Sequence, residues 1–187
     1  MMKIVSGKFG GRKLYTPKNN DIRPTSDKIR GAMFNMLQSR GALDTAHVLD
    51  AFCGTGALGL EALSRGASSC VFMDTARDSL SLACDNAEML EVDAEFLLRD
   101  ASKIGVRPHS TVPYDLIFLD PPYAQGLVSQ VLKALIDGDW IAPQGWVACE
   151  AERSFTCNAI EGCGIDIEKT YGDTKITLIQ YQPMTPE

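Results

Sequence analysis

From residue 46 onward, short apolar runs alternate with amphipathic stretches, and this alternation limits the fold more than any other feature of the chain. Strands that alternate with helices are typical of a mostly parallel, doubly wound α/β sheet with right-handed crossovers. We therefore expect an α/β fold. The predicted strands are 47–51, 69–73, 95–99, 115–119 and 145–150, and the predicted helices are 57–65, 77–90 and 126–137.

The two ends of the chain depart from this alternation. Residues 164–171 and 174–181 are extended runs joined at Gly172-Asp173, which predicts an antiparallel hairpin at the edge of the sheet. Residues 2–15 are rich in glycine and predict a second hairpin that turns through Gly7 to Gly11. The expected fold is thus an α/β sheet with a hairpin at either end of the chain.

A helix is predicted after residue 25, because apolar residues recur at 29, 32, 33, 36 and 37. Thr25 is the expected N-cap, and Asp27 is favourably placed in the first turn. The opposite side of this helix carries polar residues, so we expect it to dock on the body and still present charge. Those residues are Lys28, Arg30, Asn35 and Gln38.

Charge is distributed unevenly along the chain. Residues 1–40 carry nine Lys and Arg against two Asp, a net charge of +7, whereas the remainder carries −13 within a total of −6. A basic arm on an acidic body is a candidate footprint for a polyanion, and a merely solvated basic surface is the alternative. We expect residues 1–40 to form a nucleic-acid-binding extension and residues 41–187 to form the catalytic domain.

Residues 48–59 combine a strand, a glycine loop and a helix start. Gly54, Gly56 and Gly59 satisfy the G-x-G-x-x-G spacing, and Asp74 follows Gly54 by twenty residues, which is compatible with a dinucleotide site. Asp50 favours a different ligand, because a carboxylate aimed into the crevice would repel a pyrophosphate. It would attract the ammonium and sulfonium of S-adenosylmethionine. The same loop contributes Phe52 and Cys53.

Four acidic residues follow four successive predicted strands: Asp50, Asp74, Asp100 and Asp120. Each one alone reads as a helix cap or a loop residue. Together they predict a ligand site, since open α/β sheets bind ligands at the carboxyl ends of their strands. In that site Asp74 would accept hydrogen bonds from ribose hydroxyls, and Asp100 would accept one from the adenine amine.

The tetrad Asp120-Pro121-Pro122-Tyr123 directly follows the apolar run 116–119. An acid, a rigid proline backbone and an aromatic face can hold a flat molecule that carries an exocyclic amine. Asp120 and the Pro121 carbonyl would accept from the amine, and Tyr123 would stack on the ring. Prolines suit this role because their φ is fixed and they add no competing N–H. An ordinary turn after a strand is the alternative interpretation.

Composition excludes several other classes of protein. Six cysteines form no C-x-x-C pair and only two histidines are present, so we expect no metal site and no disulfides. No apolar run approaches the length of a membrane span, and the N-terminus lacks the long apolar stretch of a secretory signal. A cytoplasmic location is the expectation.

The Asp-Pro-Pro-Tyr tetrad and the spacing of Asp50 to Gly54 resemble the wider class of amine methyltransferases that use S-adenosylmethionine. Three further blocks are more specific: Gly10-Gly11-Arg12-Lys13-Leu14, then Arg23-Pro24-Thr25-Ser26-Asp27-Lys28-Ile29-Arg30 with Met33-Phe34-Asn35, and Gly56-Ala57-Leu58-Gly59-Leu60-Glu61-Ala62-Leu63-Ser64-Arg65-Gly66-Ala67. These blocks resemble the bacterial 16S rRNA guanine-N2 methyltransferases of the RsmD family. The resemblance covers residues 3 to about 182.

The resemblance implies a Rossmann-like, seven-stranded methyltransferase sheet. It also implies methylation of N2 of one guanine, usually called guanine 966, in 16S rRNA of the small ribosomal subunit or an assembly intermediate. Asp50, Gly54, Gly56 and Asp74 would bind the cofactor, and the segment Asp120 to Tyr123 would hold the target base. Cys53 and Ala76 depart from the residues usual in the family at those positions. We expect a monomer.

Contacts to the RNA are expected from the basic arm, because phosphate contacts position an RNA without reading its sequence. The candidates are Arg12, Lys13, Arg23, Thr25 and Lys28. Other activities stay open at this point: methylation of adenine N6 or of a protein glutamine, a nicotinamide-dependent oxidoreductase, and a non-catalytic RNA-binding protein with this fold.

Overall fold

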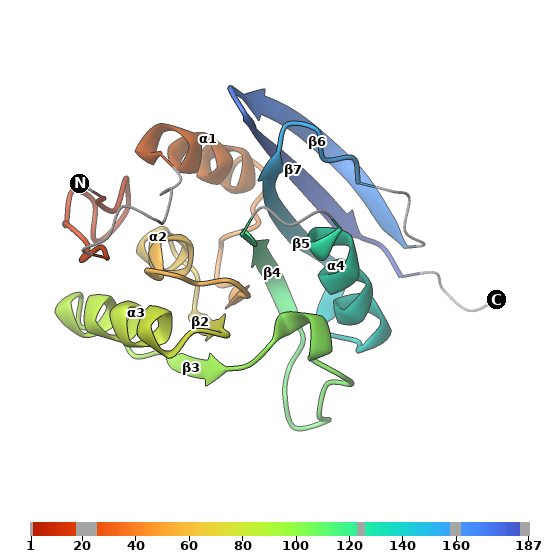
Figure 1. The fold of residues 1–187 in the computed structure, drawn as a ribbon, viewed down its shortest axis with the longest axis horizontal. Coiled ribbons are helices and arrows are strands. Elements are labelled where there is room, and N and C mark those ends of the chain that lie inside the picture. The colour runs from red at the N-terminus through yellow and green to blue at the C-terminus, as the bar shows by residue number, and fades with distance from the viewer. Residues whose placement is uncertain (1, 18–25, 123–125, 158–161, 184–187) are drawn as a thin grey trace.

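The computed structural model describes residues 2–17, 26–122, 126–157 and 162–183. Within these residues seven strands form one mixed sheet in the order β3-β2-β1-β4-β5-β7-β6 (Figure 1). The first five of these are parallel, and β7 and β6 form the predicted antiparallel hairpin. The α/β class is confirmed. The elements are α1 (Asp27–Gln38), β1 (His47–Asp50), α2 (Ala57–Ser64), β2 (Ser69–Asp74), α3 (Arg77–Met89), β3 (Glu95–Leu98), η1 (Ala101–Lys103), β4 (Tyr114–Leu119), α4 (Leu127–Asp137), β5 (Ile141–Glu152), β6 (Cys163–Tyr171) and β7 (Thr174–Tyr181).

The sheet is covered on both faces, which explains why its central strands are apolar throughout. Successive side chains of a strand point to opposite faces. In β4, Phe118 packs in the core beneath α1, α2 and α3, and Ile117 packs in the core beneath α4. Figure 1 shows these helices on either side of the sheet. The apolar runs of the sequence therefore mark strands that are buried on both faces.

The chain reverses its winding direction at β1. From β1 it passes through α2 to β2 on one side, whereas β4 lies against the other side of β1. The loops that follow β1 and β4 therefore separate at this point and leave a crevice beyond the strand ends. This topology places the glycine loop and the residues after Leu119 at the same edge of the sheet.

The predicted N-terminal hairpin forms only in part. Lys3 and Lys13 form an antiparallel bridge, and backbone hydrogen bonds join Ile4 to Arg12 and Leu14 to Met2, but no regular pair of strands develops. The reason is competition for its backbone groups: the N–H groups of Val5 and Ser6 donate to the Glu61 carboxylate, at 2.6 and 3.1 Å. These groups bind α2 and cannot also form a strand ladder.

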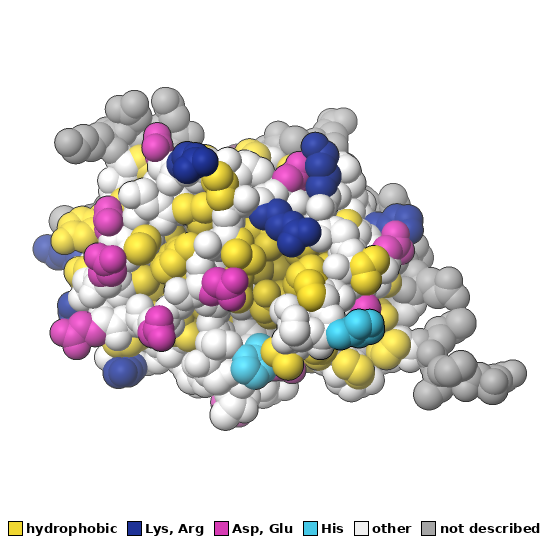
Figure 2. Space-filling model, turned by 90° about the horizontal axis from the view of Figure 1, so that it is seen from below, with side chains coloured by type: hydrophobic (Ala, Val, Ile, Leu, Met, Phe, Trp, Pro, Cys, Tyr) yellow, Lys and Arg dark blue, Asp and Glu magenta, His cyan; other side chains and the backbone are white. Residues whose placement is uncertain are grey.

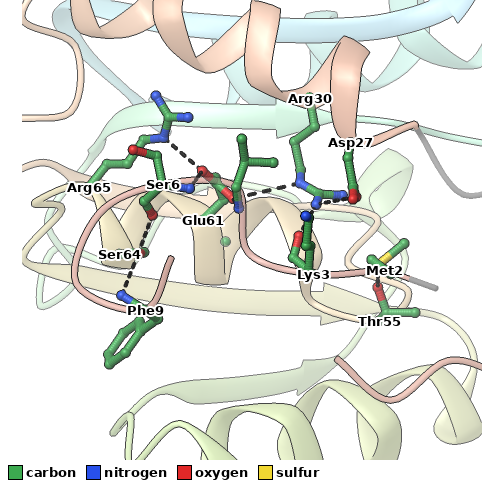
Figure 3. Close-up of polar contacts among 12 residues, drawn as sticks. Met2, Lys3, Ser6, Phe9, Asp27, Arg30, Thr55, Glu61, Ser64 and Arg65 are labelled. Atoms are coloured by element: carbon green, nitrogen blue, oxygen red, sulfur yellow. Dashed lines mark hydrogen bonds and ion pairs between the residues drawn. The ribbon is translucent and has the colours of Figure 1, made fainter. Parts of the chain in front are cut away.

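Glu61 joins three parts of the chain (Figure 3). Its side chain is fully buried, and it accepts hydrogen bonds from the N-terminal segment and from Arg65 Nε at 2.7 Å. Arg30 Nε of α1 lies 3.7 Å away. Arg30 was expected on the exposed side of its helix, but it is also fully buried and donates to the Lys3 carbonyl and to Asp27. The basic arm is thus held to α2 by buried ionic groups.

The start of α1 differs by one residue from the prediction. Ser26 is the N-cap, and its hydroxyl accepts a hydrogen bond from the N–H of Ile29 at 3.2 Å. Thr25, the expected cap, lies outside the described residues. Asp27 occupies the first turn as expected, and it is positioned to favour both the helix dipole and the Arg30 guanidinium.

Replacing Gly59 by alanine should destabilise the fold. Gly59 lies in α2 over β2, and a Cβ there would be 2.4 Å from Phe72 Cε1 and 2.6 Å from Cys70 Sγ. We expect the free energy of unfolding to fall by about 1–3 kcal/mol, as for other overpacked cores. Gly31→Ala in α1 is the matched control, since its nearest contact would be an ordinary 3.4 Å. Equal stability of both variants in urea titrations would contradict this packing.

Glu61→Gln should cost about 3–5 kcal/mol, because it removes the carboxylate that faces the two buried guanidinium groups of Arg30 and Arg65. The control is Asp137→Asn, which breaks an exposed pair with Lys133 and should change stability by less than about 1 kcal/mol. Both values come from chemical denaturation of the purified proteins. A loss below about 1 kcal/mol for Glu61→Gln would show that this cluster contributes little to stability.

Candidate active site

A cavity of about 700 Å³ lies at the carboxyl ends of the parallel strands. Its wall is formed by the loop after β1, the segment between β2 and α3, the residues after β3, and the loop after β4. The end of β5, the first turn of α1 and Met2 complete it. The cavity therefore occupies the crevice that the topology predicts.

The glycine loop brings backbone, not side chains, to one side of this cavity. Gly56 has a φ of 77°, in the left-handed region, and begins α2. Its N–H donates to the Cys53 carbonyl at 2.7 Å, and the Cys53 N–H donates to Met73 at the end of β2. Gly54 and Cys53 line the cavity, whereas Gly56 packs behind it, where a Cβ would lie 3.2 Å from Ala83.

Asp74 is held at the end of β2 by two backbone N–H groups. Its Oδ2 accepts from Gly54 at 3.0 Å and its Oδ1 accepts from Ala76 at 2.9 Å. These bonds fix the plane of the carboxylate and tie it to the glycine loop. Asp74 lines the cavity, and each oxygen keeps a second lone pair for a ligand.

Asp100 lies beyond β3 and caps the short helix η1. Its Oδ1 accepts from the hydroxyl and the N–H of Ser102, at 2.7 and 2.9 Å. The hydrogen bond from the Ser102 hydroxyl is the main cause that lowers the pKa of Asp100, with Lys103 contributing less. Asp100 also lines the cavity and is an ionised acceptor at neutral pH.

Asp50 does not face the cavity, which corrects the orientation expected from its place at the end of β1. Its side chain is fully buried beneath the loop, and Oδ2 accepts from the N–H of Gly59 at 2.9 Å. Burial raises the pKa of Asp50 to about 7, the Gly59 N–H opposes this rise, and the charge of Asp74 adds to it. Asp50 thus acts on the site by holding the loop against α2.

The remaining predicted residues divide into two groups. The cavity is also lined by Phe52, Asp120, Pro121 and Pro122. Asp120 follows β4 and Asp74 ends β2, and these two strands lie on opposite sides of β1. Tyr123, by contrast, lies outside the described residues. The structure consequently brings most of the predicted cofactor residues and the start of the predicted amine-binding tetrad to one cavity.

Sequence reasoning missed two charged residues in the cavity wall, Glu150 and Arg30. Glu150 ends the predicted strand 145–150, so the rule that selected the other acids at strand ends would also have found it. No sequence signal identifies Arg30, because its burial depends on Glu61, thirty-one residues away. Met2 and Thr55 also reach the wall, and they contact one another at 3.3 Å.

The predicted RNA contacts in the described residues are exposed. Lys13 and Lys28 are exposed, as is Arg12, whose Nη2 donates to the Met89 carbonyl at 2.9 Å. Arg23 and Thr25 lie outside the described residues. Figure 2 shows a face where acidic and basic side chains surround a band of hydrophobic ones, so its described residues form no continuous basic surface.

All six cysteines lie in the described part of the chain as free thiols. In the described part of the chain, no group of three or more His, Cys, Asp or Glu is placed to hold a metal ion. Burial raises the pKa of the Cys53 thiol, which disfavours a thiolate nucleophile beside the glycine loop. No helix among the described residues is long and apolar enough to cross a membrane.

A family model described as conserved hypothetical protein 95 matches residues 2–180. The chain belongs to this family. The Escherichia coli K12 protein named "Ribosomal RNA small subunit methyltransferase D" is 31% identical over 151 residues, which cover 81% of this chain and 75% of that protein. The protein of the same name from Haemophilus influenzae is 29% identical over 182 residues, which cover 96% of this chain and 93% of that protein. The resemblance to the RsmD family is thereby confirmed.

Solved structures agree with this assignment. The Escherichia coli protein yhhF superposes with a TM-score of 0.84 at 29% identity, covering 97% of this chain and 98% of that one. The Haemophilus influenzae protein named "putative methylase HI0767" superposes with a TM-score of 0.81 at 26% identity, covering 97% of this chain and 98% of that one. The chain therefore has a Rossmann-like methyltransferase fold and belongs to a methyltransferase family.

The raised pKa of Asp50 predicts a pH dependence of stability. Because the folded value of about 7 exceeds the ordinary 3.8, the folded protein binds this proton more tightly than the unfolded chain. The contribution of this proton to the free energy of unfolding is complete below pH 4. It falls as the pH rises to 7, by at most about 1.4 kcal/mol per pH unit. Chemical denaturation of the wild type and of Asp50→Asn between pH 4.5 and 8 measures this change in the free energy of unfolding. A difference between the two that does not change with pH would contradict this assignment.

Proposed function

We propose that this protein transfers a methyl group from S-adenosylmethionine to the exocyclic N2 amine of one guanine in small-subunit ribosomal RNA. The observation that carries the proposal is the shared cavity, in which Asp120, Pro121 and Pro122 face the same space as the glycine loop, Asp74 and Asp100. The names of the relatives support the RNA substrate. The resemblance to the RsmD family supports N2 of guanine 966 of 16S rRNA.

The charges of the cavity fit S-adenosylmethionine better than a dinucleotide. Asp74, Asp100, Asp120 and Glu150 all line it, and carboxylates in such numbers would repel a pyrophosphate. The same carboxylates attract a ligand that carries an ammonium and a sulfonium. Asp74 would accept hydrogen bonds from two adjacent ribose hydroxyls, and Asp100 would accept one from the adenine amine. When bound, the cofactor supplies an electrophilic methyl group.

The chain's contribution to catalysis would be positioning. The N2 amine of guanine is a weak nucleophile, because its lone pair is delocalised into the ring. Hydrogen bonds from the amine to Asp120 and to the Pro121 carbonyl would favour a pyramidal nitrogen with a localised lone pair. Tyr123 would stack on the base. Positioning of reactants can supply about 7–11 kcal/mol in ideal cases. Asp120 or solvent would take the proton after transfer.

A paired guanine has to leave its helix to reach this cavity, which costs a few kcal/mol. We propose that the basic extension of residues 1–40 offsets part of this cost by binding RNA phosphates. Arg12, Lys13 and Lys28 supply exposed cations there. The Glu61 cluster attaches this segment firmly to the body, so a bound RNA would be held in a fixed orientation relative to the cavity.

Two substitutions should separate the cofactor half of the site from the amine half. Asp120→Ala should lower methyl transfer to small-subunit RNA by about 10²–10⁴-fold, as expected for loss of a positioned acid–base group, and keep cofactor affinity. Asp74→Asn should weaken cofactor binding by about 10–100-fold, because it removes one charged acceptor. Labelled methyl transfer and calorimetric titration of the cofactor measure the two effects. Equal loss of cofactor affinity in both variants would contradict the proposed division.

Removal of three cations should flatten the salt dependence of RNA binding. Each lost phosphate contact should reduce the slope of log affinity against log salt by about 0.7–1. The variant replaces Arg12, Lys13 and Lys28 with Gln, and the control replaces the exposed Lys133, Arg153 and Lys169 with Gln. Filter binding at several salt concentrations gives the slopes. Equal slopes for the two variants would remove the basic extension from the RNA-binding surface.

A further inference from the structure

The pairing of β4 with β5 places a second carboxylate beside Asp120. Phe118 pairs with Ala148 and Leu119 with Cys149, and Asp120 and Glu150 are the next residues along the two segments. Neighbouring strands lie about 4.8 Å apart. Glu150 belongs to β5 and pairs with Ile176 of β7, which fixes its backbone position. It is buried at 5% exposure and lines the same cavity as Asp120.

A buried cation approaches the same cavity from the helix above. Glu150 and Ala148 lie two residues apart in β5, so their side chains point to the same face of the sheet. The side chain of Ala148 packs in the core beneath α1. Arg30, in the first turn and a half of α1, also lines the cavity and is fully buried. Its Nη2 donates to the Lys3 carbonyl and to Asp27, as Figure 3 shows. Its Nη1 has no hydrogen-bond partner among the described residues.

An unpaired buried guanidinium N–H is costly, so a partner from the cavity would stabilise it. The described wall thus offers two acceptor carboxylates at adjacent strand ends and one donor on α1. Guanine presents a complementary edge: its N2 amine and its N1–H are adjacent donors, and its O6 is an acceptor. Adenine presents one amine and an unprotonated N1, which a carboxylate would repel.

We propose that Glu150 accepts a hydrogen bond from N1–H of the target base and that Arg30 Nη1 donates to O6, so that the two residues select guanine over adenine. The inference rests on the proposed function and extends it from the reacting amine to the rest of the base. Asp120 would hold the amine, Glu150 the neighbouring imino group, and Arg30 the carbonyl oxygen. Such a site rejects adenine, because its unprotonated N1 would face the Glu150 carboxylate and Arg30 Nη1 would find no acceptor at position 6.

The base 2-aminopurine tests this directly, because it keeps the 2-amine and lacks both N1–H and O6. Small-subunit RNA is prepared by ligation with guanine or 2-aminopurine at the position that the wild type methylates. Single-turnover methyl transfer to the two RNAs gives a rate ratio for each protein. We expect the wild type to favour guanine strongly. Glu150→Met should reduce the ratio by about 10–100-fold, the range for one hydrogen bond to a charged group.

Arg30→Lys is the second variant, since it keeps a cation in the buried cluster and removes the planar guanidinium. It should also reduce the ratio by about tenfold or more. Glu152→Met, two residues further along β5 and outside the cavity wall, is the matched control and should leave the ratio unchanged. Each ratio comes from one protein preparation, so a loss of folded protein cancels.

The possible failures are distinguishable. Methylation of guanine with the same ratio in the wild type, Glu150→Met and Arg30→Lys would overturn the base-reading role and keep the proposed function. Absence of methyl transfer to any guanine by the wild type would overturn both. A wild type that methylates 2-aminopurine as fast as guanine would show that the site reads the amine alone, which also overturns the inference.

Discussion

The carboxylate of Glu61 is the contact on which the arrangement of the site depends. It binds the N-terminal segment through the N–H groups of Val5 and Ser6, and it faces Arg30 and Arg65 within one buried cluster. The buried charge of Arg30 is offset by the carboxylates of Glu61 and Asp27. The consequence for the site is spatial: Met2 and Arg30 of α1 are brought to the wall of the cavity.

The cavity combines a common scaffold with a particular distribution of charge. Reversal of the winding at β1 opens a crevice in any sheet of this type, and it does not by itself select a ligand. Here the backbone of the glycine loop borders one side, and carboxylates at successive strand ends border the rest. The buried Asp50 supports the loop from behind. A cationic cofactor and an amine substrate suit such a site for the same electrostatic reason.

The regular part of the fold could be predicted from the sequence, because it depends on local periodicity. All seven strands and the helices from α1 to α4 lie within a few residues of their predicted positions. The errors arose where one segment contacts a distant one. Val5 and Ser6 donate to α2 instead of to a strand, and Arg30 turns inward to a carboxylate that lies far along the chain. Asp50 was placed at the right strand end, but the direction of its side chain depends on Gly59.

The most direct test of this account is the identity of the methylated nucleoside. Small ribosomal subunits that lack the modification are incubated with the protein and S-adenosylmethionine, and the RNA is digested to nucleosides for mass spectrometry. The account predicts a single product, N2-methylguanosine, at one position of 16S rRNA. Methylation of adenine at N6, or label found only in protein, would contradict the assignment of the Asp120 side of the cavity to guanine.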